Sequence, residues 1–218
     1  MKITYFLDIM SSWCHWSEPT WLNLKKNYAG KVDFSWKIGL MRPSDFPSTR
    51  KQCDWFYQRS GGTSMHSAYI LNSGWLIEKR EGHYEAPNLV AEAARELGIQ
   101  DDTVRLALAH ATLRDGLDVG DLVVSVSVAS KVAKINAKKL HALADSKLIK
   151  KRLQLSTEDF FKYNVSQRPT FILESDIGDK AIFSGLVAYE PIAATLDSMA
   201  KDTKAYASHK AHYGAPPT

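Results

Sequence analysis

Cysteine is scarce in this chain, with only Cys14 and Cys53 among 218 residues. Two cysteines cannot build the disulfide framework that holds small secreted domains together. No apolar run approaches the length of about 20 residues that a transmembrane helix needs. We therefore expect a protein without a membrane partner, whose fold depends on a hydrophobic core.

Neither sign of charge dominates the sequence. Lys and Arg number 28 against 24 Asp and Glu, and the formal net charge is +4. The basic residues are scattered and form no stripe of the kind that nucleic-acid binding requires. No signal peptide, metal-ligand spacing, phosphate-binding loop or dinucleotide fingerprint is recognisable. We expect a cytoplasmic chain with no nucleic-acid partner and no metal.

The most informative stretch lies near the N-terminus. Residues 3–9 form an apolar, β-rich run whose one charge is Asp8, which is typical of a strand buried on both faces. After the turn at residues 10–12, Trp13, Trp16 and Trp21 mark the apolar positions of a helix. A strand that runs into a helix leaves its turn residues close to unpaired N–H groups, which favour an anion such as a thiolate. The expected turn carries Ser11, Ser12 and Cys14.

The order of the remaining patterns predicts the fold class. Strict alternation predicts a strand over residues 32–38. Capping and periodicity predict helices over 88–97, 102–114, 121–133, 137–145 and 158–163, strands over 170–173 and 181–183, and a helix from 191 to about 201. This order predicts an α/β, thioredoxin-like fold. Residues 1–40 and 164–202 would form its two halves, 41–163 a loop plus a helical insertion, and 203–218 a mobile tail.

Two short motifs carry a family resemblance. The run DIMSSWC at residues 8–14 resembles the active-site turn of the DsbA superfamily. The run VSQRPTFIL at residues 165–173 resembles the loop of that superfamily in which a cis-proline, here Pro169, precedes a strand. The resemblance implies a DsbA-like fold in which this loop faces the active-site helix.

The register of the active-site motif decides the chemistry. One register reads Ser11 to Cys14 and the other reads Cys14 to Ser17; the spacing from Asp8 and the place of Pro19 favour the first. Ser11 then holds the nucleophile position and Cys14 the resolving position. Neither register supplies two sulfurs, so dithiol exchange through a Cys-x-x-Cys pair is disfavoured.

Two relatives within that superfamily use serine at this place, the kappa-class glutathione transferases and the 2-hydroxychromene-2-carboxylate isomerases. The resemblance implies that the hydroxyl of Ser11 hydrogen-bonds the thiolate of glutathione or of another low-molecular-weight thiol. It also implies a homodimer and a small aromatic or electrophilic substrate. The residues implied to hold the cofactor are Ser12, Trp13, Arg168, Pro169, Thr170 and Ser184. Apart from the resemblance, the abundance of aromatic residues at 13–16, 55–57 and 75 indicates either a flat apolar substrate pocket or packing in the core or a dimer interface. The candidate residues of such a pocket are His15, Trp55 and Trp75.

Other interpretations stay open at this point. Cys14 could attack as a single redox cysteine with glutathione or Cys53 resolving, or could be a buried packing residue. The protein could also be a non-catalytic binding module, with Ser11 as a helix cap and Arg168 as a structural ion-pair partner. His66 and His83 are further candidates for substrate contact, and His110 is expected to pack within a helix.

Overall fold

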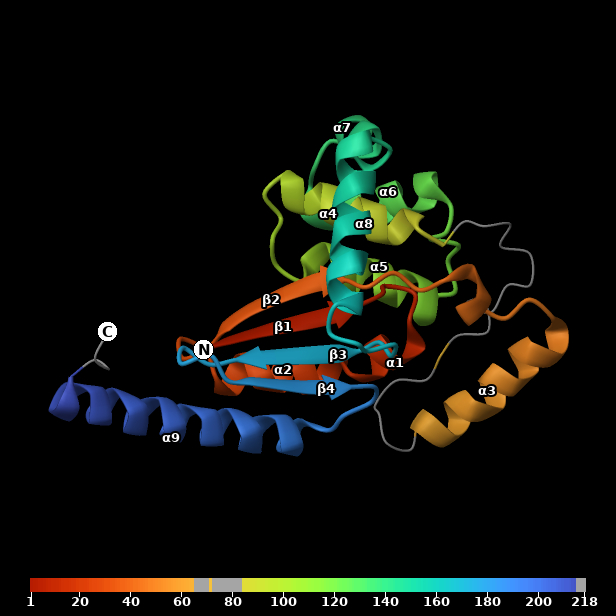
Figure 1. Ribbon diagram of the computed structural model, residues 1–218. Coiled ribbons are helices and arrows are strands. Elements are labelled where there is room, and N and C mark those ends of the chain that lie inside the picture. Colours follow the sequence, from red (N-terminus) through yellow and green to blue (C-terminus); the bar gives the residue numbers. More distant parts are fainter. Residues whose placement is uncertain (65–70, 72–83, 215–218) are drawn as a thin grey trace.

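A computed structural model describes residues 1–64, 71 and 84–214 (Figure 1). Trp75, His66 and His83 lie outside the described residues, so the predictions on them are untested. The elements in chain order are β1 (Lys2–Leu7), α1 (Ser12–Trp16), α2 (Glu18–Asn27), β2 (Asp33–Ile38), the 3-10 helix η1 (Pro43–Asp45), α3 (Arg50–Ser64), α4 (Ala86–Glu96), α5 (Thr103–Leu113), α6 (Leu122–Ala133), α7 (Ala137–Ala144), α8 (Lys147–Phe161), β3 (Thr170–Glu174), β4 (Lys180–Ser184) and α9 (Tyr189–Tyr213).

The four strands form one mixed sheet in the order β2-β1-β3-β4. β1 pairs with β2 in parallel, while β3 runs antiparallel to both β1 and β4. Tyr5 lies between Trp36 and Phe171 in this register. The expected thioredoxin-like α/β fold is therefore present, with β1 as its central, doubly buried strand.

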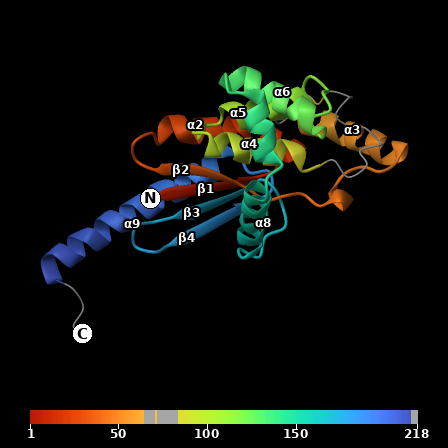
Figure 2. The same cartoon turned by 90° about the horizontal axis from the view of Figure 1, so that it is seen from above.

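The two faces of the sheet are covered by different helices. Alternation along β1 sends Ile3, Tyr5 and Leu7 into the main core, which also receives apolar residues of α2 and α9. Phe6 points to the opposite face and packs with Phe160 of α8. Figures 1 and 2 show α8 crossing this face, with α2 behind the strands.

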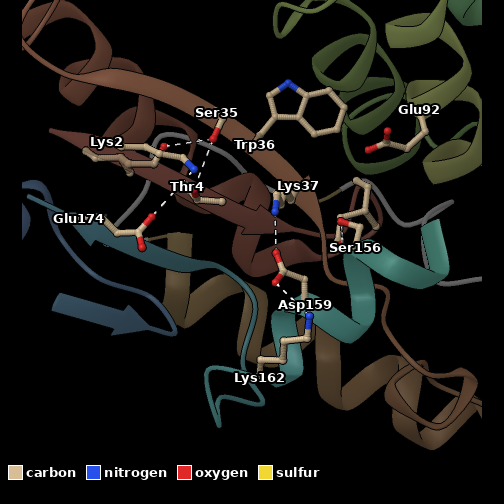
Figure 3. A network of polar contacts seen from close by, with 12 residues as sticks. Lys2, Thr4, Ser35, Trp36, Lys37, Glu92, Ser156, Asp159, Lys162 and Glu174 are labelled. Atoms are coloured by element: carbon tan, nitrogen blue, oxygen red, sulfur yellow. Dashed lines mark hydrogen bonds and ion pairs between the residues drawn. The ribbon is translucent and has the colours of Figure 1, made fainter. Parts of the chain in front are cut away.

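Polar contacts attach α8 to the strands beneath it. Lys37 of β2 donates to Asp159 at 2.6 Å, and the hydroxyl of Ser156 donates to the carbonyl of Ile38 at 2.7 Å. Figure 3 shows both side chains of the Lys37–Asp159 pair above the sheet. These contacts hold the C-terminal end of α8 where the chain turns into β3.

The helical insertion forms a cluster beside β2 (Figure 1). Asp121 caps α6 by accepting from the amides of Val123 and Val124, and the predicted helix over residues 121–133 is confirmed. Asn88 was expected to cap a helix, but this prediction is wrong, because α4 begins earlier, after Glu85. The buried Asn88 side chain instead accepts from the amide of Ile9 and joins α4 to the end of β1.

The predicted end of the last helix, at about residue 201, is also corrected. α9 continues to Tyr213 as one helix of 25 residues, and its last buried residue is Met199. Figure 1 shows its C-terminal part extending beyond the end of the sheet where β1 begins. None of the helices in the described part of the chain is long and apolar enough to cross a membrane.

Gly39, directly after β2, allows α8 to approach the sheet. A Cβ atom built on Gly39 would lie 2.9 Å from a ring carbon of Phe160. We expect Gly39→Ala to lower the free energy of unfolding by about 1–3 kcal/mol, measured by urea denaturation, because the ring must shift. The double variant Gly39→Ala with Phe160→Leu should lose less free energy of unfolding than the losses of the two single variants added together, since the smaller side chain leaves room for the Cβ atom. Strict additivity would contradict this steric explanation.

Candidate functional site

A groove of about 390 Å³ lies where the β1–α1 turn meets the loops around it. Its wall comes from four segments: the start of α1, the region after β2, α3 and the loop before β3. The residues that line it are Ser11, Ser12, Trp13, Met41, Arg42, Asp45, Phe56, Arg59, Ser166, Gln167 and Arg168.

Asp8 shapes the turn on one side of the groove. Its carboxylate accepts from the amides of Met10 and Met41, both at 2.8 Å, and its carbonyl accepts from the amide of Ser11 at 3.0 Å. Burial raises the pKa of Asp8, although the two amides act in the opposite direction. One buried side chain thus joins the active-site turn to the segment that follows β2.

Ser11 is the N-cap residue of α1. Its hydroxyl oxygen accepts from the amide of Cys14 at 3.3 Å, and the residue forms part of the groove wall. The N-cap that was one of the alternatives for Ser11 is therefore present, and the residue lines the groove although it is only 5% exposed. A serine hydroxyl has two acceptor sites and one donor, so capping leaves the O–H bond for a ligand.

Cys14 lies behind this wall in the main core and is 5% exposed. The hydroxyl of Tyr5 donates to its carbonyl at 3.2 Å. Burial raises the pKa of the Cys14 thiol to about 11. Its thiol is therefore protonated at neutral pH, which does not suit an attacking nucleophile.

Cys53 packs in a different cluster from Cys14. It lies with Trp16, Leu71 and Leu113, against the rings of Phe56 and Tyr57. Both cysteines are buried and neither forms a disulfide.

In the loop before β3, the side chain of Arg168 makes contacts that were not predicted. The peptide bond between Arg168 and Pro169 is cis. The guanidinium of Arg168, expected to meet a cofactor carboxylate, instead donates to the carbonyls of Gly39, Leu40 and Ser166. It also lies 4.5 Å over the ring of Phe160. Arg168 joins two loops through these carbonyls and also lines the groove, and ligand binding by its guanidinium stays a prediction.

The hydroxyl groups of Thr170 and Ser184 lie beside this loop and contact it. The hydroxyl of Thr170 donates to the carbonyl of Gln167 at 2.7 Å and lies 3.0 Å from the hydroxyl of Ser184. Thr170 is fully buried, and neither residue lines the groove. A direct cofactor contact through the Thr170 side chain is excluded by this burial.

An aromatic cluster around Arg59 closes one side of the groove. The guanidinium lies 4.9 Å from the ring of Trp13, 5.3 Å from Phe56 and 5.2 Å from Trp55. Burial lowers the pKa of Arg59. Trp55 belongs to this cluster but is 53% exposed and does not line the groove, whereas Phe56 does. The aromatic pocket predicted from composition is present in part, with a cation at its centre.

His15 does not contribute to the groove, contrary to the prediction. It is 1% exposed and its Nδ1 lies 3.3 Å from the carboxylate of Glu18. The other carboxylate oxygen lies 2.9 Å from His110 and 3.4 Å from Arg114. Burial alone would raise the pKa of Glu18, but hydrogen bonds and charge from the two histidines lower it to about 2.

Sequence reasoning missed five polar or charged residues of the groove: Arg42, Asp45, Arg59, Ser166 and Gln167. Gln167 lies two residues before Pro169, so its position was within reach of the loop motif. Arg42, Asp45 and Arg59 come from the region between the two motifs, where no periodicity or spacing indicates which side chains face the active-site turn.

A larger groove of about 790 Å³ lies elsewhere, between α4, α8 and β2. Its wall carries charges of both signs, including the exposed pair formed by Arg152 and Glu96. Neither of the two sequence motifs reaches it. We therefore assign the candidate site to the smaller groove beside Ser11.

No protein-family model and no curated protein sequence matches the chain. Solved structures do match it. A putative protein disulfide isomerase from Nitrosomonas europaea superposes with a TM-score of 0.77 at 16% identity, over 92% of this chain and 98% of that one. The cytosolic disulfide reductase DsbM from Pseudomonas aeruginosa gives 0.70 at 14% identity, over 92% and 99%. A 2-hydroxychromene-2-carboxylate isomerase gives 0.63 at 13% identity, over 95% and 98%.

These neighbours are DsbA-family oxidoreductases together with an isomerase of the same architecture. The chain therefore has the DsbA-like thioredoxin fold, as the two motifs predicted. At identities below 20% the likeness establishes the fold and leaves the activity to the site.

The burial of Cys14 has a direct chemical consequence. With the thiol pKa raised to about 11, we expect iodoacetamide at pH 7.5 to modify Cys14 in the folded protein at roughly a tenth or less of the rate in urea. Mass spectrometry of the peptide containing Cys14 measures this. Rapid labelling of the folded protein, with a rate that rises around pH 7, would contradict the assignment of Cys14 to the core.

Glu18 should contribute a pH-dependent part of stability. Its pKa is lowered from 4.5 to about 2, so this contribution is complete above about pH 4.5 and is lost as the pH falls towards 2. We expect Glu18→Gln to lower the free energy of unfolding by about 1–3 kcal/mol at pH 7, and the difference from wild type to shrink at low pH. The exposed Glu190 provides the control, since Glu190→Gln should change little at either pH. A pH-independent difference for Glu18→Gln would contradict the linkage.

Proposed function

We propose that this protein is a thiol-dependent transferase or isomerase that binds glutathione, or a similar low-molecular-weight thiol, with the sulfur beside Ser11. The proposal rests on one observation, which is how the serine and the cysteine of the turn between β1 and α1 are placed relative to the groove. Ser11 is among the residues that line the groove, whereas Cys14 does not line it and burial raises the pKa of its thiol. A serine in this place cannot exchange disulfides, but it can hydrogen-bond a thiolate.

The chemistry of such a hydrogen bond supports activation of a bound thiol. A hydroxyl that donates to a sulfur anion stabilises the thiolate relative to the thiol and so lowers the pKa of the ligand. Hydrogen bonds to charged groups contribute about 1.5–3 kcal/mol. A thiol held in this way would be a better nucleophile at neutral pH than in solution.

The charge of the groove fits a ligand with carboxylates. Its lining includes three arginines, Arg42, Arg59 and Arg168, against one carboxylate, Asp45. Arg168 donates to backbone carbonyls, so Arg42 is the group that would meet a carboxylate of the ligand. Arg42 also pairs with Asp45 at 3.5 Å, and its side chain is 71% exposed, so this contact adds little stability and can open.

The aromatic cluster around Arg59 suits a flat second substrate. Trp13, Phe56 and Arg59 all line the groove, and the guanidinium lies over both rings. A small aromatic or electrophilic molecule could stack there within reach of a thiol at Ser11. DsbM from Pseudomonas aeruginosa, which shares this fold, has been solved with glutathione. Homodimerisation and a cytoplasmic location remain predictions.

Calorimetric titration with glutathione tests the proposal. We expect wild type to bind saturably and Ser11→Ala to bind about 10-fold or more weakly, because one hydrogen bond to the thiolate is lost. Cys14→Ala should bind as wild type does, because its thiol lies outside the groove.

Ser146 offers a matched control, since it caps α8 as Ser11 caps α1, accepting from the amide of Ile149 at 3.3 Å. Ser146→Ala removes a cap of the same kind far from the groove and should leave the affinity unchanged. If wild type binds no glutathione, the thiol proposal fails and a non-catalytic binding module becomes the better interpretation. A loss in Cys14→Ala as large as that in Ser11→Ala would return the chemistry to the single cysteine.

A further inference from the structure

A second group of reactive side chains lies apart from the groove, where α1 and α2 meet α5. His15 belongs to α1, Glu18 is the first residue of α2, His110 lies in α5 and Arg114 follows its last turn. The side chains of His15 and Glu18 are 0% and 2% exposed, whereas those of His110 and Arg114 are about one third exposed, at 34% and 32%. The group is therefore closed on one side and open to solvent on the other.

The polar atoms of these four side chains lie close to one another. Glu18 Oε2 lies 2.9 Å from His110 Nε2. The guanidinium of Arg114 lies 3.4 Å from the same carboxylate oxygen and 3.4 Å from His15 Nε2. A positive group thus stands between a carboxylate and an imidazole nitrogen that accepts a hydrogen bond.

The donor set is one that zinc uses. Two imidazoles and a carboxylate, with a water as fourth ligand, form a tetrahedral zinc site with bonds of about 2.0–2.2 Å, so neighbouring donor atoms lie about 3.3 Å apart. One donor atom each from His15, Glu18 and His110 already lies within 4.8 Å of the others. Side-chain rotations that bring each pair of donor atoms to this separation would complete the geometry.

We propose that His15, Glu18 and His110 form a binding site for a divalent transition metal, zinc above all, in which the ion takes the place of the Arg114 guanidinium. His15 Nδ1 lies 3.3 Å from Glu18 Oε1, which lets this nitrogen donate to the carboxylate and leaves Nε2 for the metal. The partly exposed Arg114 has solvent to move into, and the partly exposed His110 lies on the entry path.

The charges of the group favour a cation. Arg114 already places a positive group 3.4 Å from the Glu18 carboxylate. This contact and the one of 3.4 Å with His15 Nε2 are longer than ordinary charge-assisted hydrogen bonds. The ion would replace these two contacts with coordinate bonds.

Metal binding would connect two parts of the fold. His15 directly follows Cys14 in α1, and His110 belongs to the helical insertion. An ion held by both would fix the helix that begins at Ser11 against α5. The sequence pattern predicted no metal site because His110 lies 92 residues from Glu18, and only the packing of α5 on α1 brings them together. This inference does not depend on the proposed thiol chemistry.

Zinc titration of the full chain against a chromophoric chelator tests the site. We expect wild type to bind one zinc ion, with a melting temperature that rises as zinc is added. His110→Gln should weaken binding at least 10-fold while leaving the fold intact, since this side chain is partly exposed. Glu18→Gln should weaken it at least as much. Arg114→Gln should tighten binding at least 3-fold, because the competing cation is gone.

The exposed histidines of α9 provide the control. His209 and His212 are three residues apart on the exposed end of that helix and could bind zinc by themselves. The double variant His209→Gln with His212→Gln should bind zinc as wild type does. Three results would overturn the proposal. They are zinc affinity in His110→Gln equal to that of wild type, loss of zinc binding in the α9 double variant, and weaker zinc binding in Arg114→Gln.

Discussion

The guanidinium of Arg168 is the contact on which the architecture around the groove depends. It binds the carbonyls of Gly39 and Leu40, while the next amide, that of Met41, is bound by Asp8. Residues 39–41 are therefore held on one side by the cis-proline loop and on the other by the active-site turn. A buried arginine can join two backbone segments at once, because its planar fork reaches several carbonyls. The groove exists because these segments are kept in fixed relative positions.

Much of this framework was predictable from the sequence, and for identifiable reasons. The apolar run at residues 3–9 and the alternation at residues 32–38 are strong local patterns, and they became β1 and β2. The two motifs, which contain Ser11 and Pro169, predicted the correct fold. Asn88 was misassigned because an asparagine near a helix start is normally a cap, whereas here its side chain serves a contact 79 residues away. The extent of α9 was missed because burial ends at Met199 while the helix continues.

The site itself was less predictable, since its character depends on which side of α1 each residue faces. Ser11 and Cys14 are one helical turn apart, yet one lines the groove and the other lies in the core. His15 follows Cys14 into the interior and joins Glu18, His110 and Arg114. No local pattern encodes that a buried carboxylate will meet a histidine from α5. Long-range packing decides it, and the same packing decides that Arg59 stands among three aromatic rings.

The length of α9 has a consequence for local stability. A helix of 25 residues spans about 37 Å at 1.5 Å per residue, whereas a strand of six residues spans about 20 Å. The half docked on the sheet supplies the helical nucleus, so the projecting half grows from it without the entropic cost of nucleation. Alanine and lysine, both strong helix formers, are frequent there. Its amide hydrogens are protected by a helix–coil equilibrium of their own, which opens far more often than the sheet unfolds.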